Sequence, residues 1–242
     1  MNQVKNFRTL ADKMMNNQCK SIKQNMIFRS GELSHITPQE IHNLISFKIK
    51  HIYDLRSATE RQNSDILNHF DIINFDVTNS KTNTPMDQAF FKKTAPSSLD
   101  FMISLYRDYL PFSPILKPLM QQIIQERHPF LFHCAAGKDR TGIVASIIMA
   151  ILDFNEEQLI EEYVLLDQEL LSSTITSLRN QGFSECVIAQ LEPLNTVQPL
   201  YLQTFLNAIK SRFGNLKNYI SEFLGLTDEQ IENFKTYFLE TL

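Results

Sequence analysis

The sequence predicts an α/β fold in which a short, mostly parallel central sheet is flanked by many helices and the C-terminal part is helical. Two observations lead to this prediction. Up to residue 152, short apolar runs alternate with helical segments, as in sheets whose parallel strands are joined by helices. From residue 155 onward the pattern is helical, and no convincing strand is seen.

The first predicted elements are strands at residues 26–29, 50–55 and 71–77, each of which is an apolar run. A helix is expected between the first two of these strands. It begins after a capping box at residues 37–40, with Pro38 at the first helical position. Apolar residues at helical spacing then give this helix one face that can pack on the sheet.

Residues 78–98 differ in composition from the predicted elements around them. They are rich in Asn, Thr, Lys, Pro and Ser, with an apolar island at residues 89–91. Loops of this length are often functional, although surface insertions are also common. A mobile flap beside the active site and a plain surface insertion are therefore both open interpretations.

The middle of the chain predicts helices at residues 99–109 and 115–127, followed by a short buried strand at residues 129–132. The next apolar run, at residues 143–152, is long enough for a buried helix. Capping signals indicate further helix boundaries, with starts at residues 155–158 and 227–230 and ends at Gly214 and Gly225.

Composition narrows the function classes. The 23 Lys and Arg residues against 27 Asp and Glu residues give a net charge of −4, which argues against a nucleic-acid binder. Hydrophobic residues make up 43% of the chain and support a sizeable core. The length of 242 residues fits one domain, so we expect residues 1–242 to form a single domain.

The cysteines and the N-terminus bear on location. Cys19, Cys134 and Cys186 do not suggest a disulfide framework, which implies a setting in which Cys134 stays reduced. Cys19 and Cys186 are expected to be ordinary thiols, with a redox partner for Cys134 as the alternative. The first 17 residues lack an apolar signal core, and the longest apolar stretch, about ten residues, is too short to span a membrane. The expected location is the cytoplasm, or the outside after export by a signal that the sequence does not display.

Residues 133–142 carry the chemistry. They read His-Cys-Ala-Ala-Gly-Lys-Asp-Arg-Thr-Gly and lie between the predicted buried strand and the buried helix. A tight loop before a helix start favours anions, because backbone N–H groups and the helix dipole point at one spot. Here the loop has Cys134 at its first position and Arg140 six residues later. This arrangement is suited to phosphate ester cleavage through a cysteinyl-phosphate.

Each residue type in this loop has a chemical reason. A helix N-terminus and a nearby arginine favour the thiolate form of a cysteine, so Cys134 is the expected nucleophile. Arg140 offers a planar fork for two phosphate oxygens. Gly137 is expected to let the loop turn, and Thr141 is expected to place its hydroxyl near the sulfur. His133, at the strand end, is expected to brace the loop. Phosphate contacts are expected from Ala135, Ala136, Gly137, Lys138 and Thr141.

A buried cysteine before a core helix is the alternative interpretation, and for an isolated cysteine it is the more common one. It does not explain why Gly137, Arg140, Thr141 and Gly142 occur at these spacings. The functional interpretation is therefore favoured.

The loop resembles the C-x5-R-[ST] loop of the protein tyrosine phosphatase superfamily. Its Gly-Lys-Asp-Arg-Thr-Gly version is similar to that of the bacterial tyrosine/lipid phosphatases of the triple-specificity type. The resemblance implies one phosphatase domain that acts on phosphotyrosine, in some members on phosphoserine/threonine, and on phosphoinositides, without metal or cofactor. Other matches follow in the expected order at residues 6–8 (with Thr9 replacing the usual acid), residues 28–33, residues 54–57 with Glu60, and residues 201–226.

Further polar residues lie near the ends of the predicted strands. Ligands of parallel sheets gather at the carboxyl ends of the strands, where Arg29, Asp54 and Arg56 are expected. Ion pairs that brace the loops are the favoured interpretation for all three residues, and a direct role in the site is the alternative. Glu60 is expected to pair with Arg29 or Arg56.

The general acid is open among three aspartates. The chain contains no tryptophan, so it cannot carry the Trp-Pro-Asp loop of the large tyrosine phosphatases. Asp139 is the natural substitute, with helix N-capping as its alternative role. Asp54 and Asp76 are the other candidates. Lys138 is either a solvated loop lysine or a contact to an additional phosphate of a lipid headgroup.

Two other function classes fit parts of the sequence. A non-catalytic phospho-ligand binding module would lack the cysteine or the arginine, and both are present. A rhodanese-like sulfurtransferase also uses a cysteine in an anion-binding loop, but the arginine and threonine that end this loop disfavour it. The expected partners are phosphoproteins or phosphoinositides as substrates, compatible with peripheral membrane contact, and not nucleic acid.

Overall fold

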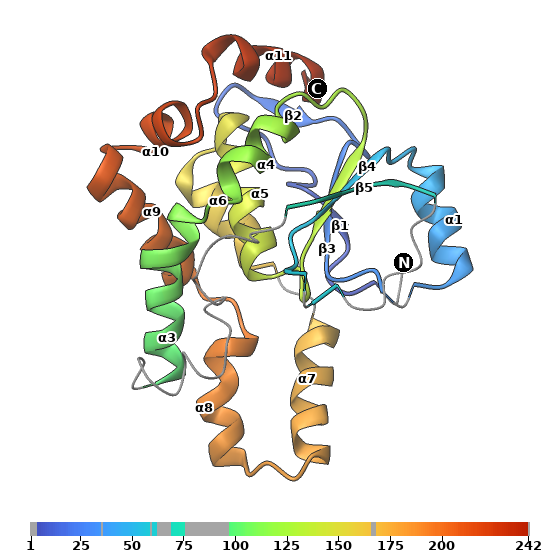
Figure 1. The fold of residues 1–242 in the computed structure, drawn as a ribbon, viewed down its shortest axis with the longest axis vertical. Helices are drawn as coiled ribbons and strands as arrows, with labels where there is room; N and C mark the ends of the chain where they lie inside the picture. Colours follow the sequence, from blue (N-terminus) through green and yellow to red (C-terminus); the bar gives the residue numbers. More distant parts are fainter. Residues whose placement is uncertain are drawn as a thin grey trace.

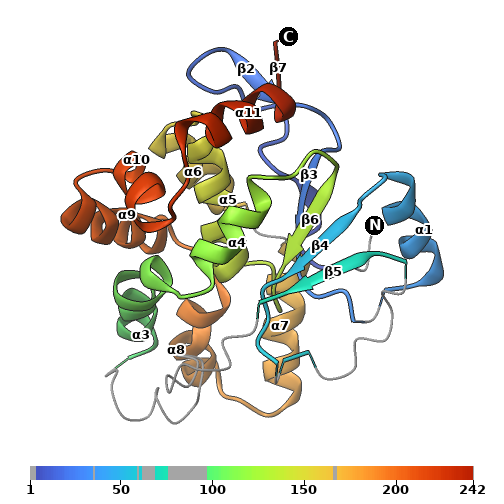
Figure 2. The same cartoon turned by 45° about the horizontal axis from the view of Figure 1, so that its top comes forward.

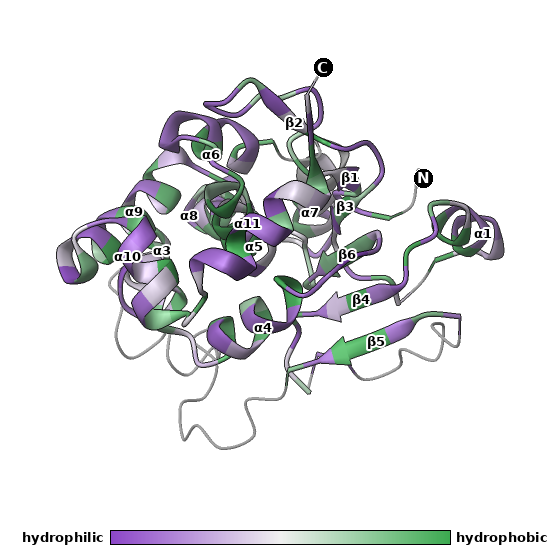
Figure 3. Ribbon diagram, turned by 90° about the horizontal axis from the view of Figure 1, so that it is seen from above, coloured by the Kyte–Doolittle hydropathy of each residue, from purple (hydrophilic) through white to green (hydrophobic). Residues whose placement is uncertain are grey.

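The computed structural model describes residues 4–34, 36–58, 60–61, 69–75, 97–165 and 168–241. At its centre lies a five-stranded sheet made of Arg8–Thr9 (β1), Ile27–Ser30 (β3), His51–Asp54 (β4), Asp71–Asn74 (β5) and Phe130–His133 (β6). Figure 1 shows the sheet among its helices, and the strand order is β1-β3-β6-β4-β5, with all five strands labelled in Figure 3. The pairings of β3, β6, β4 and β5 are parallel, and β1 pairs with β3 in the antiparallel direction. The predicted, mostly parallel sheet is therefore confirmed.

Side chains of the central strand β6 alternate between two cores. Phe130 and Phe132 belong to the larger core, whereas Leu131 belongs to the smaller one. Successive side chains of a strand point to opposite faces of the sheet, and all four residues of β6 are buried. A parallel strand that is covered on both faces needs apolar residues throughout, which explains the unbroken apolar run that predicted it.

Helices cover both sides of the sheet. Figures 2 and 3 show Pro38–Ser46 (α1) on one side and the larger group of helices on the other. The central helix of that group is Asp139–Ile151 (α5), which is buried along nearly its whole length. The further α-helices are Ser98–Ser104 (α3), Leu116–Ile123 (α4), Glu156–Tyr163 (α6), Gln168–Asn180 (α7), Glu185–Asn195 (α8), Pro199–Phe213 (α9), Leu216–Asn218 (α10) and Asp228–Phe238 (α11).

Capping boxes begin three of these helices, as the sequence predicts. In each box the first side chain accepts a bond from the third helical N–H, and the side chain at that position reaches back to the capping residue. The pairs are Thr37 with Glu40 at α1, Asn155 with Gln158 at α6, and Thr227 with Gln230 at α11.

The C-terminal part is not helical to its end. Leu239–Thr241 form a strand, β7, that pairs in the antiparallel direction with Lys20–Ile22, β2. The prediction of no strand beyond residue 155 is therefore wrong at this point. A strand of three residues carries no recognisable alternation, and its partner lies near the other end of the chain.

The segment predicted as one helix at residues 99–109 consists of two parts. α3 ends at Ser104, and Leu105–Tyr109 continue as a π-helical turn. A 3₁₀ turn follows at Leu110–Phe112. π-Helical turns are frequent at functional sites. This one places Tyr106 in the core with no exposed surface.

Two sequence predictions fall outside the described residues. They concern Asp76 as a general acid and the segment at residues 78–98, of which only residues 97 and 98 are described. In the part of the chain that the structure describes, no helix is both long enough and apolar enough to cross a membrane.

Candidate functional site

Residues 134–138 form a loop that joins the end of β6 to the start of α5. As predicted, the loop begins with Cys134, and Arg140 follows in the first turn of the helix. Strand β6 has a parallel neighbour on each side, so the loop leaves the sheet at the middle of its carboxyl edge. Cys134 is 3% exposed and forms no disulfide.

Three successive carbonyl groups of the loop are tied to the N-terminal part of the chain. All three donors lie on or near β3, the strand beside β6, or just before β1. The bonds run from the backbone N–H of Glu32 to the oxygen of Ala135 (2.9 Å), from Nδ2 of Asn6 to that of Ala136 (3.0 Å), and from Nη2 of Arg29 to that of Gly137 (3.0 Å).

These bonds fix the direction of the loop's amide groups. In a planar trans peptide the C=O and the N–H point in opposite directions. Because the carbonyls of residues 135–137 are held outward, the N–H groups of residues 136–138 turn toward the inside of the loop. Together with the positive end of the α5 dipole, they supply the donors that an anion needs.

Gly137 in the loop and Gly142 in α5 each allow a close approach to a neighbouring segment. Gly137 has a φ of 69°, and a Cβ at this position would lie 2.5 Å from backbone atoms of Ser30 and Gly31. A Cβ at Gly142 would lie 2.8 Å from the ring of Tyr163. Gly137 therefore meets both a conformational and a steric requirement, whereas Gly142 is required by the contact between α5 and α6.

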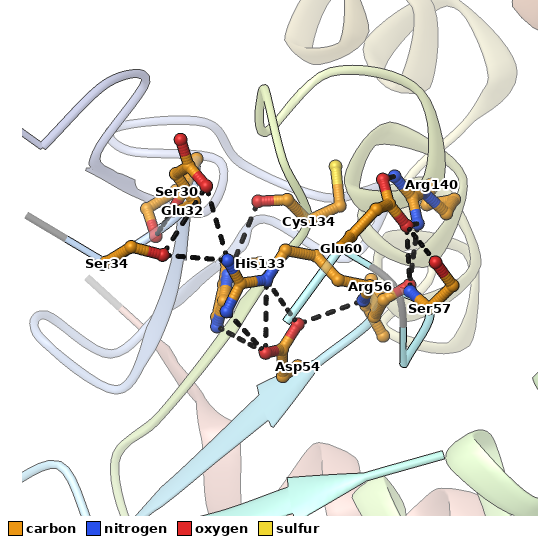
Figure 4. Close-up of polar contacts among 12 residues, drawn as sticks. Ser30, Glu32, Ser34, Asp54, Arg56, Ser57, Glu60, His133, Cys134 and Arg140 are labelled. Atoms are coloured by element: carbon orange, nitrogen blue, oxygen red, sulfur yellow. Dashed lines mark hydrogen bonds and ion pairs between the residues drawn. The ribbon is translucent and has the colours of Figure 1, made fainter. Parts of the chain in front are cut away.

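Arg140 is held by a carboxylate (Figure 4). Its Nη1 and Nη2 each lie 2.7 Å from a different oxygen of Glu60, and Ser57 donates to the same carboxylate from its N–H and its hydroxyl, both at 2.8 Å. The prediction that Glu60 pairs with Arg29 or Arg56 is wrong. The fold brings the first turn of α5 to Glu60, and nothing in the sequence around Glu60 identifies that neighbour.

This ion pair keeps both groups charged. Burial opposes the charge of Glu60, but the hydrogen bonds from Arg140 outweigh it and lower the pKa of Glu60 to about 2. Burial likewise opposes the charge of Arg140, and the hydrogen bonds to Glu60 with the field of Cys134 raise the pKa of Arg140. The arginine therefore keeps its positive charge beside the cysteine.

Asp54 and Arg56 form a buried ion pair next to the loop. The distance from Nη2 of Arg56 to Oδ2 of Asp54 is 2.8 Å, and Nη1 of Arg56 contacts Glu32 at 3.2 Å and Ser34 at 2.9 Å. Burial would raise the pKa of Asp54, but the hydrogen bonds from Arg56 prevail and lower it. Because Asp54 is held in its charged form, it fits the predicted role in a bracing ion pair better than the role of a proton donor.

His133 lies between this ion pair and the cysteine, as Figure 4 shows. Its Nε2 is 3.8 Å from Oδ2 of Asp54, and its Nδ1 is 3.4 Å from the backbone oxygen of Cys134. Complete burial lowers the pKa of His133 to about 4, against the opposing effect of Asp54. A neutral buried ring in this place fits the bracing role predicted from the sequence.

Arg29 forms the buried ion pair expected for it. Its Nη1 lies 3.0 Å from Oε1 of Glu162 on α6, and Arg8 contacts the same carboxylate at 3.3 Å. Glu162 was not recognised as a site residue from the sequence. It is one of several glutamates in an amphipathic helix, and only the tertiary packing leaves it 1% exposed.

Asp139 is not the side-chain cap of α5. Its Oδ1 accepts a hydrogen bond from the hydroxyl of Tyr106 at 2.6 Å, and Nζ of Lys138 lies 2.8 Å from its carboxylate. The start of α5 has no side-chain capping bond, so the N-capping alternative is wrong. Lys138 is 5% exposed, so the alternative of a solvated loop lysine is also wrong.

The Thr141 hydroxyl makes no hydrogen bond to the sulfur of Cys134 in the described part of the chain, and its expected place near the sulfur stays a prediction. Its oxygen is buried and has no hydrogen-bond partner among the residues that the structure describes. Thr141 therefore keeps a free donor beside the loop. Cys19 and Cys186 are exposed, and both are free thiols.

The central parallel strand, the cysteine loop that follows it and the arginine at the helix start together define the α/β architecture of the candidate site. A family model described as the tyrosine phosphatase family matches residues 1–240. The chain therefore belongs to the tyrosine phosphatase family, and it is a phosphatase. This membership separates it from the rhodanese-like sulfurtransferases and from non-catalytic binding modules.

Two curated relatives are similar over most of the chain. A Cupriavidus necator protein named "Putative tyrosine-protein phosphatase" is 23% identical over 214 residues, which cover 87% of this chain and 78% of the relative. A protein of Nostoc commune named "Tyrosine-protein phosphatase" is 25% identical over 226 residues, with 89% and 74% covered.

The Glu60–Arg140 pair predicts an acid-dependent contribution to stability. Because the folded state lowers the pKa of Glu60 from 4.5 to about 2, the contribution is complete above pH 4.5 and is lost as the pH falls toward 2. Glu60→Gln is therefore expected to lower the free energy of unfolding at pH 6 by about 1–2 kcal/mol, a value reduced by solvent screening. The difference from the wild type should shrink between pH 4.5 and 2, as measured by urea denaturation.

Glu185→Gln is the matched control, since Glu185 forms an exposed ion pair with Arg179. It should change the unfolding free energy little at any pH. A difference between Glu60→Gln and the wild type that stays constant down to pH 2 would contradict the assignment.

Proposed function

We propose that this phosphatase uses Cys134 as its nucleophile and hydrolyses phosphate monoesters through a cysteinyl-phosphate, without metal or cofactor. One observation carries the proposal. Cys134, whose thiol is buried, is the first residue of a loop whose N–H groups turn inward. The charged Arg140 follows six residues later, in the first turn of α5. We further propose that residues 1–242 form a single phosphatase domain.

In the first step the Cys134 thiolate attacks phosphorus, the S–P bond forms and the P–O bond to the leaving group breaks. The leaving oxygen takes a proton from the Asp139 carboxyl. In the second step water attacks the cysteinyl-phosphate, gives its proton to Asp139, and releases inorganic phosphate and the thiolate. The inward N–H groups and the Arg140 fork hold the phosphate oxygens through both steps.

Two neighbours of Arg140 support its proposed role. Glu60 holds the planar guanidinium in one orientation, and the carbonyl of Leu55 accepts a further bond from Nη1 at 3.1 Å. A fork that is already oriented loses less freedom when it binds phosphate.

We propose that the substrates are phosphotyrosine in proteins, also phosphoserine or phosphothreonine, and phosphoinositides, as in the bacterial triple-specificity phosphatases. Lys138 supports the lipid part of this proposal. Its ammonium group lies beside the loop, is nearly buried, and is paired with Asp139. A second phosphate on the substrate would draw Lys138 from that carboxylate and give it a stronger anionic partner.

The Cys134→Ser variant tests the nucleophile. It should lose turnover and still bind a phosphotyrosine peptide, because the inward amides and Arg140 survive the change. Orthovanadate should inhibit the wild type, because it mimics the five-coordinate transition state. The measurements are steady-state kinetics and peptide binding, with and without EDTA.

Cys186→Ser is the matched control, because Cys186 is an exposed thiol, and it should keep full activity. Substantial turnover by Cys134→Ser, or loss of wild-type activity in EDTA, would refute the mechanism.

The Asp139→Asn variant tests the general acid. A proton donor matters more for poor leaving groups, so alkyl phosphates should slow by about 10²–10⁴-fold and aryl phosphates with good leaving groups much less. The ratio of kcat values on the two substrate types is the measurement.

The Asp54→Asn variant tests whether Asp54 is the general acid instead. The control is Asp108→Asn, because Asp108 forms an exposed ion pair and its replacement should not change the ratio. An equal loss on both substrate types for Asp139→Asn would assign this residue a structural role.

The Lys138→Met variant tests the lipid substrates. It should reduce kcat/KM on a soluble phosphoinositide by about tenfold or more, because a charge-assisted contact to a second phosphate is worth about 1.5–3 kcal/mol. A phosphotyrosine peptide, with one phosphate, should lose less. Lys210→Met, at an exposed lysine, should affect neither substrate. Equal losses on both substrates would instead assign Lys138 to the loop itself.

A further inference from the structure

A chain of buried hydroxyl groups leads from α6 to Asp139. The hydroxyl of Tyr163 lies 2.8 Å from that of Tyr106, and the hydroxyl of Tyr106 lies 2.6 Å from Oδ1 of Asp139. Tyr106 has no exposed surface, and Tyr163 is 2% exposed. Among the described residues, the Asp139 side chain accepts hydrogen bonds from the Tyr106 hydroxyl and from the Lys138 ammonium group.

The positions of the protons follow from the chemistry of the groups. The hydroxyl of Tyr106 donates its hydrogen bond to Oδ1 of Asp139, an oxygen that accepts whether the carboxyl group is ionised or carries its proton on Oδ2. The hydroxyl oxygen of Tyr106 then accepts a hydrogen bond from the hydroxyl of Tyr163. Burial and the charge of Asp139 raise the pKa of Tyr106 well above its ordinary value, so the donor persists at every working pH.

The ring of Tyr106 has little freedom to move. It stacks on the ring of Tyr201 with centroids 5.4 Å apart, and the ring of Tyr163 meets it edge-on at 6.2 Å. Its backbone belongs to the π-helical turn Leu105–Tyr109. Because two aromatic neighbours and the backbone hold this ring, its hydroxyl has one position, and so does the oxygen that it binds.

We propose that Tyr106 is a positioning residue of the reaction: its hydroxyl fixes the Asp139 carboxyl group, and through it the Lys138 ammonium, beside the phosphate-binding loop. This inference rests on the proposed function, because it assigns a purpose to the position of Asp139. Tyr106 lies outside the loop, 33 positions before Asp139 in the sequence. Tyr106 itself touches neither the substrate nor the reacting atoms.

The Tyr106→Phe variant removes the hydroxyl and leaves the ring in its packing. With the carboxyl free to turn, we expect kcat on an alkyl phosphate to fall about tenfold, and KM to change by less than about twofold. An aryl phosphate with a good leaving group should lose much less. The ratio of the two kcat values does not depend on the folded fraction, so a loss of stability alone would leave it unchanged.

Tyr219→Phe is the matched control. Tyr219 is also fully buried, and its hydroxyl donates at 2.7 Å to the backbone oxygen of Pro111, which is not a residue of the loop. This variant should lose stability to a similar degree without any change in the ratio of alkyl to aryl activity. A change in the ratio for Tyr219→Phe as large as for Tyr106→Phe would overturn the proposal.

A double-mutant cycle with Asp139→Asn gives the decisive result. If Tyr106 acts through Asp139, Tyr106→Phe should have almost no further effect in the Asp139→Asn background. Effects that multiply would overturn the positioning role while the wild-type activity still supports the phosphatase mechanism. Alkyl phosphatase activity that persists in the Cys134→Ser variant would instead refute the proposed function.

Discussion

The site depends on the outward attachment of three loop carbonyls to the N-terminal part of the chain. A backbone that turned those carbonyls inward would present oxygen atoms to a phosphate and repel it. The attachment requires β3 to lie beside β6, and it requires Arg29 to be buried beside Gly137. A buried guanidinium needs a charged partner, and Glu162 of α6 supplies it. The outward direction of the loop carbonyls therefore depends on strand order and on a helix, α6, that follows the loop in sequence.

The arginines that lie near Cys134 are each paired with a carboxylate, so their charges are compensated before any substrate binds. Asp54 neutralises Arg56, Glu60 neutralises Arg140, and His133 is neutral because burial disfavours its charged form. Breaking one such pair would leave an uncompensated charge in a poorly solvated place, which costs far more than an exposed pair contributes. Bracing residues and binding residues are therefore hard to separate by substitution alone.

Local signals in the sequence predicted much of the fold, and non-local contacts account for the rest. The capping boxes and the apolar run before Cys134 act within a few residues, so they could be recognised directly. The pairing of β2 with β7, and that of Glu60 with Arg140, join distant segments and carry no local signature. The cysteine loop was found because several residue types occur there at fixed spacing.

The end of α6 supports the loop through two adjacent residues. Glu162 acts on Gly137 through Arg29, and Tyr163 acts on Asp139 through Tyr106. Neighbouring residues of a helix point in different directions, which is why one helix end can reach both sides of the loop. The ring of Tyr163 also packs where a side chain at position 142 would lie, which fixes the distance between α6 and α5. The glycine that ends the loop motif is thus needed less for phosphate binding than for the approach of the helix that orients the loop.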